Sequence, residues 1–342
     1  MPEATLSTVS RTSPSRNLMG KRPLFGQQHQ TAAMWLSAPA IILMLVLLVI
    51  PILVAVFLSF TSYGLGGSME WVGLENYKRI FSHSSYQKML SSTLTYVLIV
   101  VPISTLLGLG AALLINSLRF GKDIYKTIYF LPVMASLLAM AIVWEFTLHP
   151  TIGVINDTLQ QGCNSVFWYP FLSGEWYGNN PATSWYGESC NSNFPLWFGD
   201  KNYAIWTISF IGIWQSFGFN MMLYLAGLTS VQRELYNAAE MDGVNSAWSR
   251  FHLVTWPMLG PTTVFVITIT MIRSFQIFDT VEAITHGGPA KSTYMMLYAI
   301  YEKSVQQNII GLGSAITVLF LLMVMGLTVL QRWFIDRKVH YS

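Results

Sequence analysis

The sequence has few charged residues for its length. Only 10% of its 342 residues are Asp, Glu, Lys or Arg, against roughly 25% in an average soluble protein. It has no run of Lys or Arg typical of a nucleic-acid-binding patch and no His or Cys cluster with metal or catalytic spacing. It also lacks the G-x-x-x-x-G-K-[ST] motif, so the chain cannot cradle ATP phosphates itself. These absences argue against a nucleic-acid-binding protein and against an enzyme.

What the sequence does have is long apolar runs, with 53% hydrophobic residues overall. A helix needs about 20 apolar residues to cross a bilayer. We therefore predict an all-α integral membrane protein with a domain over residues 34–334. Its six predicted transmembrane helices are 34–62, 89–116, 127–148, 203–228, 259–285 and 306–334.

The distribution of basic residues predicts the orientation. If both termini are cytoplasmic, about twice as many Lys and Arg residues lie inside as outside, which fits the positive-inside rule. Residues 1–33 and 335–342 are then cytoplasmic tails, the first of them flexible.

Residues 149–202 become the largest outside loop, and they contain both cysteines of the chain, Cys163 and Cys190. An oxidising exterior makes a disulfide between them plausible. The alternative is two free thiols in a cytoplasmic loop, which requires the inverted topology.

The cytoplasmic loop between the fourth and fifth predicted spans is longer than a connector requires. Thr229 and Gln232 resemble a capping box for a short helix over 231–241. Gly243 is expected to end that helix, Ser246 to cap a second one, and Pro257 to stop it. The result is a helix–glycine–helix hairpin, residues 229–257, which is called the coupling loop below.

Two features of this loop suit docking to another protein. Ala238 and Ala239 would let a second surface approach closely, and Glu240 and Asp242 could meet basic residues. The alternative from the loop alone is an amphipathic interfacial hairpin without a partner.

Several segments resemble bacterial ABC importer permeases of the maltose and glycerol-3-phosphate type. In the coupling loop, NAA-x3-G followed by W-P resembles the family's "EAA" loop, with Asn237 in place of its glutamate and one extra residue between Gly243 and Pro257. The other matching segments, in the same order as in the family, are 71–81, 128–144, 153–157, 278–293 and 301–315. An insertion at 161–193 departs from the family pattern.

The resemblance implies a type I importer fold, a bacterial inner-membrane location and no cofactor in this chain. ATP and Mg would be bound by two separate ATP-binding subunits. The other implied partners are a second homologous permease, forming a heterodimer, and an extracytoplasmic solute-binding protein. The implied ATPase-coupling residues are Asn237, Ala238, Ala239, Glu240, Asp242, Gly243 and Pro257.

Uncharged polar and aromatic residues in the fourth and fifth spans would suit a sugar path. The resemblance maps sugar-contacting positions onto Gln215, Ser216, Phe219, Thr270, Arg273, Ser274 and Ile277. On a continuous helix Thr270, Ser274 and Ile277 share one face. For each polar residue the alternative is a bond to another helix or to its own helix backbone.

Arg273 is the most informative of these residues, because a guanidinium within a membrane is costly and usually functional. It could pair with an acidic residue of the partner permease, contact a polar or anionic substrate, or extend to the membrane interface. Asp279 could pair with it within the chain only if the helix is irregular.

The insertion contains eight aromatic residues, which could stack on sugar, pack a disulfide-bonded cap, or contact the binding protein or the membrane interface. We predict a permease subunit for ATP-driven import of sugars that forms half of the pathway. The alternatives are import of glycerol 3-phosphate or another anionic sugar derivative and, from a different class, a secondary transporter or channel.

Overall fold

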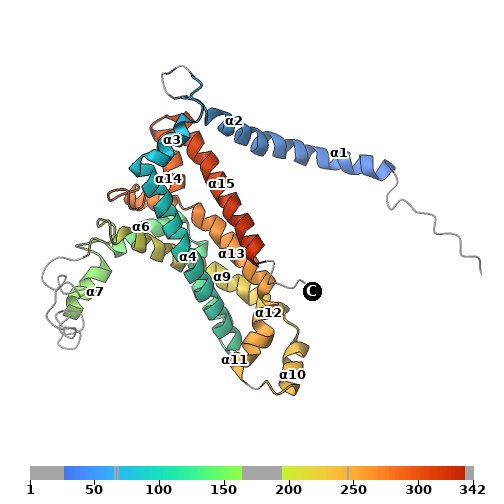
Figure 1. Cartoon of the computed structure of the whole chain (residues 1–342). Helices are drawn as coiled ribbons and strands as arrows, with labels where there is room; N and C mark the ends of the chain where they lie inside the picture. The colour runs from blue at the N-terminus through green and yellow to red at the C-terminus, as the bar shows by residue number, and fades with distance from the viewer. Residues whose placement is uncertain (1–26, 65–66, 68, 164–194, 245, 336–342) are drawn as a thin grey trace, which may run out of the picture. The chain divides into compact units, whose positions relative to one another are not determined.

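The computed structural model describes residues 27–64, 67, 69–163, 195–244 and 246–335. These residues form helices and one isolated bridge between Thr61 and Trp71, with no strand among them. The predicted all-α class is confirmed. Figure 1 follows the chain through α1 Gln27–Met44, η1 Leu45–Val49, α2 Ile50–Leu58, α3 Glu75–Ser82, α4 Ser84–Ser117, α5 Lys122–Met134, α6 Leu137–Thr147, α7 Val154–Cys163, α9 Ala204–Ser230, α10 Arg233–Met241, α11 Ala247–Arg250, η4 Phe251–Thr255, α12 Trp256–Met258, α13 Gly260–Phe275, η5 Val281–Thr285, α14 Met296–Tyr301, η6 Glu302–Gln306 and α15 Ile310–Ile335.

Four helices are long and apolar enough to cross a membrane: Met34–Leu58, α4, α9 and Ile310–Gln331. The number rises to six if each of two bent pairs counts as one span. One pair is α5 with Leu138–Thr147, bent by 100°, and the other is Ala247–Met258 with α13, bent by 67°. The described residues thus support four to six spans, and six stays a prediction.

The chain divides into two compact units, residues 1–54 and 55–342. In the first, the described part is helical throughout and begins at Gln27, before the predicted start of the first span. Its side chains from Met34 onward are almost all exposed, as expected for a segment whose surroundings are lipid.

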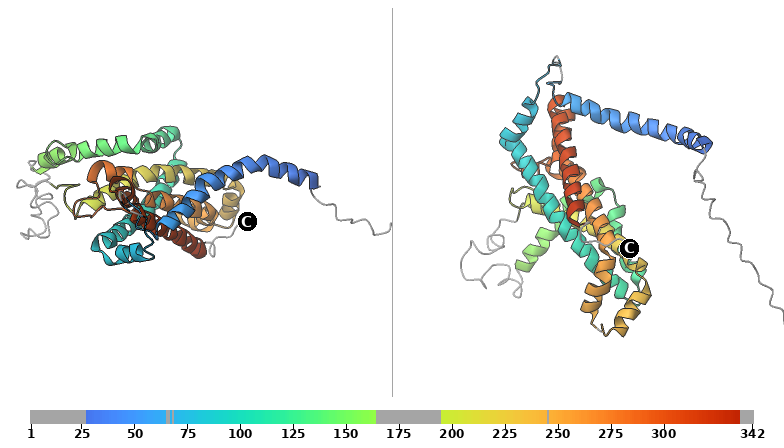
Figure 2. Two further views of the ribbon diagram at one scale, coloured as in Figure 1. Left: turned by 90° about the horizontal axis from the view of Figure 1, so that it is seen from above. Right: turned by 45° about the vertical axis from the view of Figure 1, so that its right-hand side comes forward.

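The second unit has its core where α4, α9 and α13 meet (Figure 1 and Figure 2). One buried cluster joins α4 and α9 to α14 and α15 through residues such as Val100, Ile208 and Ile316. Another joins α4, α9 and α13 through Leu109, Met221 and Val266. Together these clusters make α9 the central helix of the unit, in contact with α4, α5 and α13.

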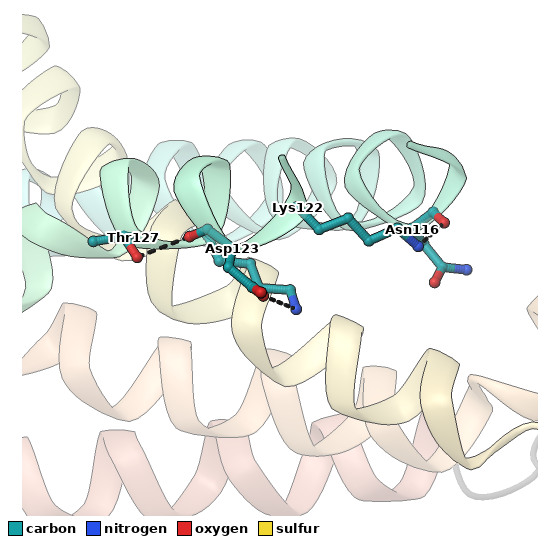
Figure 3. Close-up of polar contacts among 5 residues, drawn as sticks. Asn116, Lys122, Asp123 and Thr127 are labelled. Atoms are coloured by element: carbon teal, nitrogen blue, oxygen red, sulfur yellow. Dashed lines mark hydrogen bonds and ion pairs between the residues drawn. The ribbon is translucent and has the colours of Figure 1, made fainter. Parts of the chain in front are cut away.

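The turn between α4 and α5 is closed by local polar contacts (Figure 3). Lys122 Nζ donates to the carbonyl oxygen of Asn116 at 2.8 Å, at the C-terminal end of α4, where a cation also complements the helix dipole. Asp123 lies in the first turn of α5 and pairs with Lys126 at 3.0 Å, while the Thr127 hydroxyl donates to the Asp123 carbonyl at 2.8 Å. The Lys122–Asn116 bond spans the turn, and the other two contacts stabilise the first turns of α5.

Two predicted spans are interrupted rather than continuous. Between α5 and α6 the chain is extended at Ala135 and Ser136, and the Ser136 hydroxyl accepts from the Ala139 amide at 3.2 Å as an N-cap. After Phe275 the α-helix ends, and residues 277 and 278 have no regular structure before η5. Both interruptions border the cavity described below.

Between η5 and α15 a second polar cluster holds the chain together. The Tyr294 hydroxyl donates to Glu302, and Lys303 pairs with Glu302 at 3.3 Å and donates to Gln307 at 2.8 Å. Burial, and then the bond to Glu302, raise the pKa of Tyr294 above its usual value. The phenol therefore stays protonated and can keep donating this hydrogen bond.

Candidate functional site: a polar cavity and an exposed coupling loop

A polar cavity of about 380 Å³ lies at the interruption of the fifth predicted span. Gln215 and Ser216 reach it from α9, and Arg273 and Ser274 from the last turn of α13. The complete lining is Tyr96, Val133, Ala135, Gly212, Gln215, Ser216, Arg273, Ser274, Gln276, Ile277, Phe278, Asp279 and Thr280. The cavity therefore offers hydroxyl, amide, guanidinium and carboxylate groups within one space, which suits a polyhydroxylated solute.

The guanidinium of Arg273 lies over an aromatic ring at this cavity. Its guanidinium carbon lies 4.0 Å from the centre of the Phe219 ring, a cation–π geometry. Within the described part of the chain no ion pair involves Arg273.

The predicted substrate-path residues fall into three groups. Gln215, Ser216, Arg273, Ser274 and Ile277 line the cavity, and Phe219 supports Arg273. Thr270 does not line it: its side chain is buried and its hydroxyl donates to Asn220 at 2.8 Å. For Thr270 the structure thus favours the alternative, a bond between helices.

Eight of the thirteen lining residues were not assigned to the path from the sequence, and Asp279 and Tyr96 are the most informative of them. Asp279 shares the cavity with Arg273 because α13 ends at Phe275, the irregularity that such proximity requires. The next helical turn already includes Asp279, and the Glu282 amide donates to Phe278 O at 2.9 Å. No local sequence pattern predicted this break inside the span. Tyr96 reaches the cavity beside Gly212, where an added Cβ would lie 2.1 Å from the Tyr96 hydroxyl. No local pattern reveals that contact.

The coupling loop forms the expected hairpin between α9 and α13. Gly243 has φ +81° and follows α10. Its amide donates to Glu240 O at 3.0 Å, and the Val244 amide donates to Ala239 O at 2.9 Å, which together make a Schellman motif. The prediction that Gly243 ends the first helix is confirmed.

Inside the hairpin a small apolar cluster joins its two arms. Val231, Ala239 and Val254 are buried together. The Tyr236 hydroxyl lies 3.1 Å from the Thr255 hydroxyl, and Arg250 Nε donates to Val244 O at 3.2 Å. Ala239 therefore packs within the hairpin instead of forming its outer surface, unlike Ala238.

The outer surface of the coupling loop carries the remaining predicted coupling residues. Asn237, Ala238, Glu240, Asp242, Gly243 and Pro257 are all exposed. Neither Glu240 nor Asp242 forms an ion pair with any residue that the structure describes. Met241 and Trp248 are 89% and 70% exposed. An acidic and apolar tip of this kind is suited to contact another protein.

Two local expectations for the loop are wrong. Thr229 does not cap α10, because α9 continues to Ser230 and the Thr229 hydroxyl donates to Ala226 O at 2.8 Å. Pro257 does not itself end the second helix, which continues one residue further to Met258, and the 67° bend follows at Leu259. Proline lacks the amide that bonds to the preceding helical turn, so it is tolerated only near the end of this helix.

The proposed Cys163–Cys190 disulfide and most of the 161–193 insertion lie outside the described residues. Among the residues described, no group of three or more His, Cys, Asp or Glu side chains is placed to hold a metal ion.

Comparison with known proteins agrees with the resemblance in the sequence. Residues 104–340 match the family described as "binding-protein-dependent transport system inner membrane component". The chain is 27% identical to the sn-glycerol-3-phosphate transport system permease protein UgpA of Agrobacterium fabrum, over 90% of this chain and 95% of that protein. It is 30% identical to the probable ABC transporter permease protein YesP of Bacillus subtilis, over 89% and 90% of the two chains.

Solved structures show the same fold. A chain from the crystal structure of a bacterial ABC transporter involved in import of the acidic polysaccharide alginate aligns with a TM-score of 0.72 at 18% identity, covering 92% of this chain and 99% of that one. A second structure of an alginate transporter, with a periplasmic protein bound to alginate pentasaccharide, gives a TM-score of 0.71. The family match covers more than half of the sequence, and this chain belongs to the binding-protein-dependent transport system inner membrane components.

Proposed function

We propose that this chain is one of two permease subunits of an ATP-driven importer of sugars, and that the polar cavity is its share of the solute path. One observation carries the proposal: α9 and α13 both line the cavity, and the coupling loop joins these same two helices. A movement imposed on the exposed loop thus reaches the two helices that hold Gln215, Ser216, Arg273 and Ser274.

The proposed partners are two ATP-binding subunits, a second permease and an extracytoplasmic binding protein. The chain carries no ATP-binding motif in its printed sequence, so two separate ATP-binding subunits supply the energy and hold ATP and Mg. The acidic tip with Glu240 and Asp242 docks on one of them. A homologous permease forms the other half of the path, and an extracytoplasmic binding protein delivers the solute.

The orientation follows from this assignment. The coupling loop is cytoplasmic, as are both termini, and the chain lies in the bacterial inner membrane. The excess of basic residues on the proposed cytoplasmic side supports this arrangement.

Sugars are favoured as the solute by the mixture of donors and acceptors in the cavity. The probable starch degradation products transport system permease protein AmyD of Thermoanaerobacterium thermosulfurigenes is 23% identical over 89% of this chain. Anionic sugar derivatives are the second candidate, because Arg273 has no ion-pair partner in the described chain and because UgpA is assigned to glycerol 3-phosphate.

The test is uptake of a panel of radiolabelled neutral sugars and glycerol 3-phosphate by cells that express the complete transporter and lack other uptake systems. We expect uptake that vanadate inhibits and that requires the co-expressed ATPase. Uptake driven by a proton gradient and independent of any ATPase would instead establish a secondary transporter. The solute retained by the binding protein distinguishes the two substrate candidates.

A further inference from the structure

Three buried polar side chains connect three helices at one level of the core. Ser104 of α4 and Asn220 of α9 are both 0% exposed, and Thr270 of α13 is 2% exposed. The Thr270 hydroxyl donates to Asn220 Oδ1 at 2.8 Å, and Asn220 Nδ2 donates to Ser104 Oγ at 3.3 Å. This set is called the interhelical hydrogen-bond chain below.

The donors and acceptors of this chain are mutually consistent. Ser104 accepts a hydrogen bond from Asn220, and its own hydroxyl donates to Val101 O at 3.4 Å. Asn220 thus uses its amide oxygen toward α13 and its amide nitrogen toward α4. One side chain connects the central helix to two of its neighbours, α4 and α13.

The backbone around Asn220 provides the space for this contact. A Cβ added at Gly108 of α4 would lie 2.7 Å from the Asn220 Cβ and 3.0 Å from the Met221 amide nitrogen. Glycine at position 108 therefore permits the close approach of α4 to α9, which brings Ser104, one turn earlier, within reach of Asn220.

A polar group buried among apolar side chains selects one helix register. A shift of one residue moves a helix by about 1.5 Å along its axis, enough to lengthen both bonds of Asn220 beyond hydrogen-bonding distance. The displaced amide would then be buried without a partner, which is unfavourable in an apolar core. Apolar contacts alone discriminate less sharply between registers.

The hydrogen-bond chain lies next to the polar cavity along both α9 and α13. Asn220 directly follows Phe219, and Thr270 precedes Arg273 by three residues, about one helical turn. Phe219 and Arg273 meet at 4.0 Å. The same pair of helices therefore makes two adjacent contacts, one that is buried and one that faces the solute path.

From this juxtaposition we propose that Asn220 is a positioning residue: it fixes α9 against α13 and thereby holds Phe219 beneath Arg273. The inference rests on the proposed role of the cavity as the solute path. It adds that α9 and α13 keep their mutual register while the coupling loop between them moves. Asn220 itself contacts no solute.

The experiment measures the distance between α9 and α13 in the assembled transporter. Spin labels are attached at Ala226→Cys on α9 and Phe265→Cys on α13, both exposed positions, in a background with Cys163→Ser and Cys190→Ser. Electron–electron double resonance then gives the distance distribution without nucleotide and after trapping with ADP and vanadate. We expect one narrow distribution that is the same in both states.

Thr270→Val removes the bond to Asn220 with little change in shape, and it should broaden the distribution. The ratio of displaced to native arrangement should rise about threefold or more. The matched control is Thr268→Val on the same helix, which removes the 2.8 Å bond from Gln331 of α15 but leaves Asn220 untouched. It should give the native distribution. The exchanged pair, Asn220→Thr with Thr270→Asn, should restore a narrow distribution.

The opposite results would overturn the inference. They are an unchanged distribution in Thr270→Val, equal broadening in Thr268→Val, or a native distance that changes between the two nucleotide states. The labels report helix register whatever solute is carried, so failure here differs from failure of the import assignment, which the uptake assay detects.

Discussion

The polar cavity and the coupling loop are built in opposite ways. The cavity takes its residues from α4, the α5–α6 bend, α9 and the break after α13, so it exists only when helices far apart in sequence have packed. The coupling loop is held by contacts within one stretch of about 25 residues. The proposed solute site therefore depends on tertiary packing, whereas the proposed docking site depends on local contacts.

The largest effect is expected where the helices of the cavity region approach most closely. A Cβ at Gly218 would lie 2.0 Å from the Tyr129 carbonyl oxygen, a backbone atom of α5. Gly218→Ala should therefore force α5 away from α9 and destabilise the subunit by about 2 kcal/mol or more. Thermal unfolding of the detergent-purified subunit measures this. Gly110→Ala, with nothing within 4 Å, is the control, and equal stability of the two variants would refute the close approach.

A charge change in the cavity should separate transport from assembly. Arg273→Gln keeps a polar side chain but loses the cation beside Phe219, and we expect vanadate-sensitive uptake to fall about tenfold. Co-purification with the ATP-binding subunit should stay normal, because the coupling loop is untouched. Normal uptake would show that Arg273 is dispensable for the path.

A backbone change in the coupling loop should instead weaken assembly with the ATP-binding subunit. Gly243→Val places a β-branched residue at φ +81°, which costs about 1–3 kcal/mol in backbone strain. Co-purification with the ATP-binding subunit should then weaken, with the thermal stability of the membrane region near that of the native chain. Gly243→Asn is the control, because asparagine tolerates this conformation. Equal co-purification of both variants with native protein would argue against docking through this turn.

The smallest effect is expected within the hairpin. Tyr236→Phe removes the contact of the hydroxyl with Thr255 and should destabilise the loop by about 1 kcal/mol. Faster amide hydrogen exchange over residues 233–258 would reveal it, while α4 exchanges as in the native chain. An effect spread over the whole subunit would mean that the loop is not a local unit.

The coupling loop and the polar cavity also differ in how well the sequence predicted them. The hairpin was predictable because glycine after a short helix is a local signal, and Gly243 has the expected conformation. Ser246 stands at the N-cap position of α11, but its side chain forms no cap hydrogen bond there. The apolar runs likewise identified the long helices. The failures at Thr229 and Pro257 concern helix ends, where the packing of α9 and of the bend at Leu259 decides the boundary.

The cavity was predictable only in part. The polar residues of α9 and α13 stood out against apolar neighbours, yet nothing local showed that Thr270 would turn to Asn220 or that Asp279 would join Arg273. Both outcomes depend on where other helices lie. The end of α13 at Phe275, inside the predicted fifth span, is the structural feature that the sequence least revealed.

The central claim is that the outer surface of the coupling loop docks on an ATP-hydrolysing subunit. The most direct measurement places a photo-crosslinking amino acid at Asn237, which is exposed on α10, and in a second variant at Phe265, which is exposed on α13. In membranes that contain the complete transporter, position 237 should form an adduct with the ATP-binding subunit and position 265 should not. The absence of an adduct from position 237, in a transporter that still takes up its solute, would contradict the account.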